Sequence, residues 1–148
     1  FNIRLKINLC SRLLGLMSLR TGLLLFYHIY IIKSIKKHLE EKNFSCNLWL
    51  LGDFNSPSEV RNEGYDLVKK SGFFDTYELA KVKDSGITVE GVIDGWRDKI
   101  ENIDACKGMR IDHIFSKHDI SVRSSLVIFN GQNEPVISDH FGVMIETE

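Results

Sequence analysis

Residues 50–55 of this chain read Leu-Leu-Gly-Asp-Phe-Asn, and this stretch decides the fold. The apolar residues 48–51 predict a short core strand, and the glycine after them predicts a tight turn. Side chains two positions apart along an extended chain point to the same side. We therefore expect Asp53 and Asn55 to reach one substrate atom together, although both residue types are also common in turns that bond to their own backbone.

A second polar segment, Ser138-Asp139-His140, precedes residues 141–145, which predict another strand. Acids, an amide and a histidine at strand ends are the groups that metal-assisted attack on a phosphoester requires. They offer oxygen ligands for a hard cation, a group that orients water and a carrier of protons. A histidine packed in the core is the commoner role of a lone His140.

Three motifs occur in order over residues 44–148: Gly-Asp-Phe-Asn at 52–55, Arg-Ile-Asp-His-Ile-Phe at 110–115 and Ser-Asp-His at 138–140. Together they resemble the endonuclease/exonuclease/phosphatase superfamily of metal-dependent phosphoesterases. The resemblance implies an α/β fold, the carboxy-terminal half of a DNase I-like two-sheet β-sandwich flanked by helices. Residues 64–67 and 92–96 are most similar to a bacterial branch that includes maltose-6'-phosphate phosphatase.

The resemblance also implies roles for the motif residues. Asp53 orients or deprotonates the attacking water and lies beside the metal, which is Mg²⁺ or Mn²⁺ because hard oxygen ligands suit these ions. Asn55 donates hydrogen bonds to the phosphate, His140 contacts a phosphoryl oxygen or carries a proton, and Asp139 is a ligand of the metal or of its water.

Asp112 is the expected partner of His140. In the strand predicted over residues 109–115, Ile111 and Phe115 share one face and Asp112 lies on the other. An acid inside an apolar strand needs a partner, and a carboxylate beside His140 would raise the pKa of the imidazole. The alternative is an acid on an edge strand that faces water.

Trp96 and Arg97 lie in a glycine-rich stretch and are further candidates for substrate binding. An aromatic ring and a guanidinium suit a sugar ring and a phosphate. A packed tryptophan and a surface arginine are the default for these residue types.

The charge is uneven along the chain. Residues 1–42 hold eight basic and two acidic residues, whereas the remainder carries a net charge of −7. An acidic body argues against broad nucleic-acid affinity and favours a small phosphorylated substrate such as a sugar phosphate. Three cysteines without metal-binding spacing indicate reduced thiols and a cytoplasmic protein.

Residues 1–43 form an apolar and basic leader with a predicted helix at 33–42, and residues 44–148 form the family-like domain. The longest uncharged run in the leader, 21–32, has 12 residues, short of the ~20 that span a bilayer, so we expect no stable membrane anchor. Neither the Asn nor the metal-ligand Glu of the family's amino-terminal half has a match in the leader. We therefore expect a truncated enzyme with impaired activity.

Three functions stay open at this point. The first is a phosphatase of small sugar phosphates, and the second is a nuclease or lipid phosphodiesterase of the same superfamily. The third is an inactive fragment that binds a phosphorylated ligand or a partner. For the local structure, the sequence predicts a capped helix from Ser56 to about Lys70, a short helix over 76–82, and a strand over 122–129.

Overall fold

The computed structural model describes residues 30, 33–34, 37, 48–91 and 108–148. The chain divides into two compact units, Phe1–Ser45 and Cys46–Glu148, and the fold described below is that of the second. Of the helix predicted over 33–42, Lys33, Ser34 and Lys37 are helical, and the remainder lies outside the described residues. No helix within the described ranges combines the length and hydropathy of a membrane span.

The first sheet contains the strand that carries Asp53. Its strand order is β1-β6-β2, and both pairings are antiparallel. The strands are β1 (Trp49–Asp53), β6 (Asp112–Ser116) and β2 (Phe74–Asp75). The register places Asp53 directly opposite Asp112, so the ends of two strands bring two acids together.

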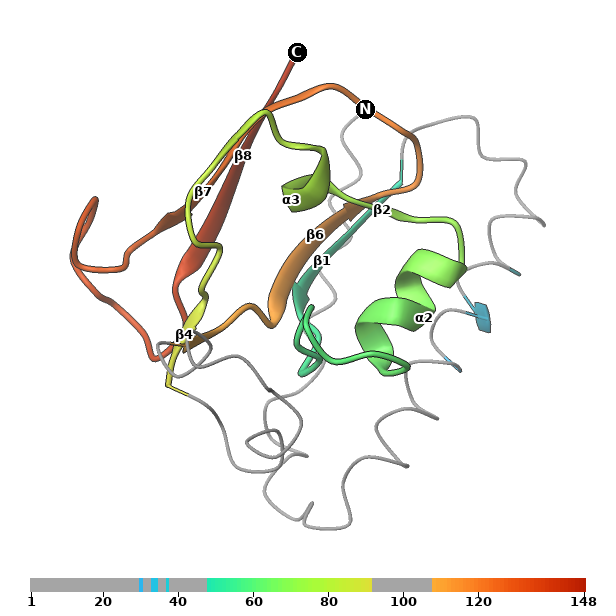
Figure 1. Ribbon diagram of the computed structural model, residues 1–148, viewed down its shortest axis with the longest axis horizontal. Helices are drawn as coiled ribbons and strands as arrows, with labels where there is room; N and C mark the ends of the chain where they lie inside the picture. Colours follow the sequence, from blue (N-terminus) through green and yellow to red (C-terminus); the bar gives the residue numbers. More distant parts are fainter. Residues whose placement is uncertain (1–29, 31–32, 35–36, 38–47, 92–107) are drawn as a thin grey trace, which may run out of the picture. The chain divides into compact units, whose positions relative to one another are not determined.

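The second sheet carries the strand that follows His140. Its order is β3-β7-β8, with β3 parallel and β8 antiparallel to β7. The strands are β3 (Val82–Lys83), β7 (Val122–Ile128) and β8 (Gly142–Thr147). A small ladder of β4 (Val89–Glu90) and β5 (Gly108–Met109) completes the strands of the described residues. In Figure 1, β1 and β6 lie side by side, and the β7–β8 pair flanks them.

Helix α2 (Gly64–Lys70) is shorter than the predicted helix, so the prediction that it begins at Ser56 is wrong. Asn62 adopts a left-handed backbone with φ 64°, which a continuous helix does not allow. Residues 58–63 form turns and bends instead. Ser56 still caps α2, but from nine residues away, because its Oγ accepts the Tyr65 N–H at 2.8 Å.

Helix α3 (Thr76–Leu79) also ends earlier than predicted. Asp75 caps its start by accepting the Tyr77 N–H at 3.0 Å. Ala80 is extended, and Val82 leaves the helix to pair with Ser124 in β7. Pairing with a neighbouring strand outweighs the local helix propensity at this position.

The strand predicted over 109–115 is interrupted at Arg110 and Ile111. The interruption follows from a change of partner, because Met109 pairs with Val89 in β4 whereas Asp112 pairs with Asp53 in β1. Asn130 and Gly131 form a turn: Asn130 Oδ1 accepts the Gln132 N–H at 3.0 Å, and Gly131 has a φ of 80°. The turn opens the connection to β8.

Aromatic side chains form the core beneath the first sheet. The ring of Phe115 is fully buried and lies 5.2 Å from Phe54, 5.4 Å from His113 and 5.7 Å from Tyr65. Burial of one such side chain stabilises the fold by roughly 1.5–3 kcal/mol. This packing fixes β6, and Asp112 on its opposite face, against β1.

Candidate active site

Asp53 lies at the end of β1 in a turn that its own side chain closes. Its Oδ1 accepts the backbone N–H of Asn55 at 2.7 Å, and its Oδ2 accepts the Asn55 side-chain amide at 2.8 Å. Asn55 has a φ of 44°, in the left-handed region that Asn tolerates better than most residues. The acid and the amide therefore form the turn that was the alternative, and their joint contact with one substrate atom stays a prediction.

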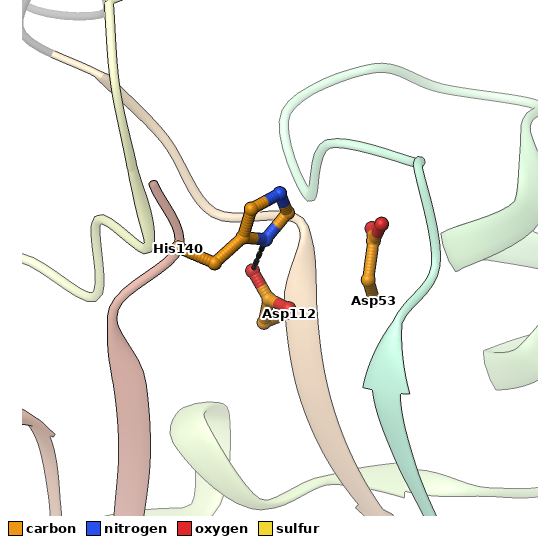
Figure 2. A group of neighbouring side chains, drawn as sticks. All are labelled: Asp53, Asp112 and His140. Carbon is orange, nitrogen blue, oxygen red and sulfur yellow. Dashed lines mark hydrogen bonds and ion pairs between the residues drawn. The ribbon is translucent and has the colours of Figure 1, made fainter. Parts of the chain in front are cut away.

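His140 and Asp112 are in direct contact, as the sequence predicted. The distance from His140 Nδ1 to Asp112 Oδ2 is 2.9 Å, and the two side chains are 31% and 18% exposed. Figure 2 shows His140, Asp112 and Asp53 in a row, with the second ring nitrogen of His140 directed away from Asp112. Nε2 is therefore the ring nitrogen left for another group.

The three side chains form a group of possible metal ligands. One ligand atom each from Asp53, Asp112 and His140 lies within 4.8 Å of the others. Asp139 is not in this group; its carboxylate accepts a hydrogen bond from Ser138 Oγ at 3.1 Å. Trp96 and Arg97 lie outside the described residues, so their predicted role in substrate binding stays a prediction.

The surroundings shift two pKa values in the group. Loss of hydration raises the pKa of Asp53, and the charge of Asp112 adds to this effect against the hydrogen bonds from Asn55. For His140, burial alone would lower the pKa, but the hydrogen bond and charge of Asp112, followed by the charges of Asp53 and Asp139, raise it overall. The site thus favours a protonated imidazole beside its carboxylates.

A buried polar network lies behind the site, and the sequence analysis did not predict it. Arg110 donates to Asp75 Oδ2 at 2.7 Å and to His113 Nδ1 at 2.9 Å. The hydroxyl of Tyr65 donates to the same Asp75 oxygen at 2.6 Å. His113 Nε2 lies 3.0 Å from the carbonyl oxygen of Ser56, to which it donates. The network joins α2, β2 and the turn after β1.

The charges in this network fix its protonation states. Burial would raise the pKa of Asp75, but Arg110 and Tyr65 lower it overall. Burial and the nearby Arg110 charge lower the pKa of His113 to about 4. Alternation along β6 could have indicated that His113 faces away from Asp112; nothing local marks Asp75 or Tyr65 as its neighbours.

Several solved structures resemble this chain. An endonuclease/exonuclease/phosphatase family protein from Leptotrichia buccalis is 38% identical, with a TM-score of 0.64 over 80% of this chain and 42% of its own. A mannosyl-6-phosphatase from Bacteroides thetaiotaomicron is 23% identical, with a TM-score of 0.55 over 83% of this chain and 45% of its own. No family model and no curated protein matches the chain.

A third structure is a 3' phosphatase, NExo, from Neisseria bound to a product DNA hairpin. It is 15% identical, with a TM-score of 0.56 over 83% of this chain and 52% of its own. The shared fold is about half of a DNase I-like α/β domain. The chain belongs to the endonuclease/exonuclease/phosphatase superfamily, and it spans roughly half the length of the structures that it matches.

Proposed function

We propose that this site hydrolyses phosphoesters with the help of a divalent cation, and that its substrate is a small sugar phosphomonoester. The observation that carries the proposal is the convergence of Asp53, Asp112 and His140 at the ends of strands from two sheets. The superfamily of the chain consists of divalent-metal-dependent phosphoesterases, which agrees with this donor set.

The donor set fits Mg²⁺ or Mn²⁺. Two carboxylates supply hard oxygen donors, which suit either ion. Asp53 and Asp112 would hold the ion, with Asp139 as a predicted ligand through water, and His140 stays available for the phosphate. Such an ion neutralises phosphate charge and lowers the pKa of a bound water. Since Mg²⁺ takes about six ligands, we expect weak binding without further donors.

Each side chain then has a chemical task. Asp53 accepts the proton of the attacking water, and its raised pKa brings its basicity closer to neutral pH. Asn55 donates to the phosphate, and a neutral amide adds no repulsion against the anion. His140, held at Nδ1 by Asp112, donates from Nε2 to a phosphoryl oxygen. Proton transfer of this kind contributes roughly 10²–10⁴ in rate.

Charge supports a small substrate. Residues 43–148 carry a net charge of −7, and tight binding to DNA depends on clustered Lys and Arg. The Bacteroides neighbour is a phosphatase of a mannosyl-6-phosphate and the Neisseria neighbour binds a DNA hairpin, so the shared fold is compatible with both substrate classes. A nuclease or lipid phosphodiesterase is therefore the second candidate, and a phosphate-binding domain without turnover is the third.

The test is hydrolysis by the purified full chain in Mn²⁺ or Mg²⁺. The panel contains mannose 6-phosphate, maltose 6'-phosphate, a phosphodiester analogue and a 3'-phosphorylated DNA hairpin. We expect release of phosphate from the sugar phosphates, below the ordinary range of roughly 1–10³ per second, because so few protein ligands hold the metal weakly. Asp53→Asn and His140→Ala should each remove this activity.

Asp119→Asn is the matched control, because Asp119 is an exposed acid outside the site. Cleavage of only the diester or the hairpin would favour the second candidate. No turnover, with phosphate binding that Asp53→Asn and His140→Ala weaken, would favour the third. Turnover that is independent of metal and unchanged in both variants would overturn the assignment of the site.

A further inference from the structure

Thr88 is a fully buried polar residue at the start of the β4–β5 ladder. It lies outside every motif described above. A buried hydroxyl is costly unless it is hydrogen-bonded, so its partners indicate what it does in the fold.

Thr88 donates its N–H at 2.9 Å and its hydroxyl at 3.5 Å to the Met109 carbonyl, and its other partners are backbone groups at or next to Asp112 and His140. Thr88 Oγ1 accepts the N–H groups of Ile111 and Asp112, both at 3.2 Å. The carbonyl oxygen of Thr88 accepts the Phe141 N–H at 2.8 Å, directly after His140. One residue therefore holds the chain at Asp112 and beside His140, although these lie 28 residues apart in sequence.

The same segment also reaches Asp53. The carbonyl of Ile111 accepts the Phe54 N–H at 2.9 Å, directly after Asp53. Ile111 lies in the interruption between β5 and β6, where the strand changes partners. The Thr88 hydroxyl supplies the acceptor that a regular ladder would provide there.

We propose that Thr88 is a positioning residue for the Asp112–His140 pair: its hydroxyl fixes the start of β6, its carbonyl fixes the start of β8, and together they set the contact between the two side chains. The proposal deepens the proposed function and rests on it for its catalytic meaning. The geometric part, in which Thr88 controls the contact, is independent of any turnover.

Thr76 offers a matched comparison. It is 1% exposed, and its Oγ1 donates to the carbonyl of Ile114 in the same strand at 2.8 Å. Loss of either hydroxyl removes a buried hydrogen bond to β6. Of the two residues, only Thr88 also contacts the segment that carries His140, through its carbonyl, which Thr88→Val retains, so this variant tests the hydroxyl.

The experiment compares the wild-type full chain with Thr88→Val, Thr88→Ser and Thr76→Val, all free of metal. NMR follows the ring Nδ1–H proton of His140, which is protected from exchange only while Asp112 accepts it. We expect this signal in the wild type, in Thr88→Ser and in Thr76→Val, and its loss in Thr88→Val. Its persistence in Thr88→Val, or its loss in Thr76→Val as well, would overturn the proposal.

A second measurement keeps the proposal testable if Thr88→Val does not fold. In the wild type, the amide protons of Asp112 and Phe141 should exchange as slowly as those inside β6; exchange at the rate of exposed loop amides would contradict the proposal.

Binding of Mn²⁺ alone to the same proteins separates the positioning role of Thr88 from the metal site of the proposed function. We expect Thr88→Val to weaken Mn²⁺ binding by roughly 10–100-fold, as for other residues that orient ligands. Thr76→Val should leave the Mn²⁺ affinity unchanged. Equal affinity in Thr88→Val and wild type would count against Thr88 as a positioning residue. A wild type that binds no Mn²⁺ would count against the metal site of the proposed function, and the His140 signal would then still decide the role of Thr88.

Discussion

His140 Nδ1 lies 2.9 Å from Asp112 Oδ2, where Asp112 begins β6 of the first sheet and His140 lies just before β8 of the second. The contact orients the imidazole, because a carboxylate at Nδ1 holds the proton there and leaves Nε2 for a ligand. It also holds the two sheets together at the strand ends where Asp53 lies. The Asp112–His140 pair therefore both orients the imidazole and links the ends of the two sheets.

Asp112→Asn should lower the pKa of His140 toward its ordinary value of 6.5, because the variant removes the charge that favours the imidazolium. The change is measured by NMR titration of His140. Phosphate binding should weaken most between the new pKa and that of the wild type, where only the wild-type imidazole is protonated. The double variant Asp112→Asn with His140→Ala should lose much less activity than the sum of the losses in the two single variants, as for residues that act as a unit. Additive losses would refute the pair.

Asp53→Asn should remove activity without destabilising the fold. The pKa of Asp53 is raised in the folded chain. Its protonated form therefore adds stability below pH 3.8 that is lost as the pH rises through the raised pKa. A neutral amide should thus raise the melting temperature at pH 7 and have little effect at pH 3. A variant that melts lower than wild type at pH 7 would show that the ionised acid is needed for the turn.

The contacts of the site could be predicted because they depend on short-range rules. Asp53 and Asn55 follow a strand within three residues, and strand alternation separates Asp112 from the buried Ile111 and Phe115. The contact with His140 needed one further step, namely that a half-buried acid requires a partner. The alternation rules use only neighbours in the sequence, whereas the choice of His140, 28 residues from Asp112, rests on the resemblance of the motifs.

The features that could not be predicted depend on residues far apart in the chain. The break between β5 and β6 exists because β4 pairs with Met109 and β1 with Asp112. Helix α2 begins late because Asn62 leaves the helical region, although Ser56 and Pro57 resemble a helix start. The ion pair of Asp75 and Arg110 joins residues 35 positions apart, and no local pattern marks it.

Arg110→Met should be strongly destabilising. The side chains of Arg110 and Asp75 are 9% and 0% exposed, so removal of the guanidinium leaves a buried carboxylate without its counter-charge. Loss of one partner of a buried pair costs about 3–5 kcal/mol. Urea unfolding measures the change, and Asp75→Asn in the same chain should restore part of it.

The control is the surface pair of Arg123 and Glu146, whose side chains are 59% and 55% exposed. Arg123→Met should change the free energy of unfolding by roughly 0–1 kcal/mol, as for other exposed pairs. Equal effects of the two arginine substitutions would mean that the buried network contributes no more than a surface ion pair.

Acid should weaken the fold through His113. Its pKa in the folded chain is about 4, below the ordinary 6.5. Between pH 4 and 6.5, His113 therefore binds a proton in the unfolded chain but not in the folded chain. Stability is fully present above pH 6.5, falls as the pH drops toward 4, and levels off below that for this group. The loss is about 3 kcal/mol at most. Urea unfolding at several pH values measures it.

The acid effect of His113 must be separated from two contributions of the opposite sign. As the pH falls through the raised pKa of Asp53 toward 3.8, protonation of this carboxyl adds stability to the folded chain, so the series is measured in Asp53→Asn. His140, with its raised pKa, takes up its proton mainly above pH 6.5, outside the window. His118→Gln is the matched control, because His118 is exposed and lies outside the network. Constant stability from pH 6.5 to 4.5 in the Asp53→Asn chain, or a His113 ring that titrates near 6.5, would show that burial and Arg110 do not hold the imidazole neutral.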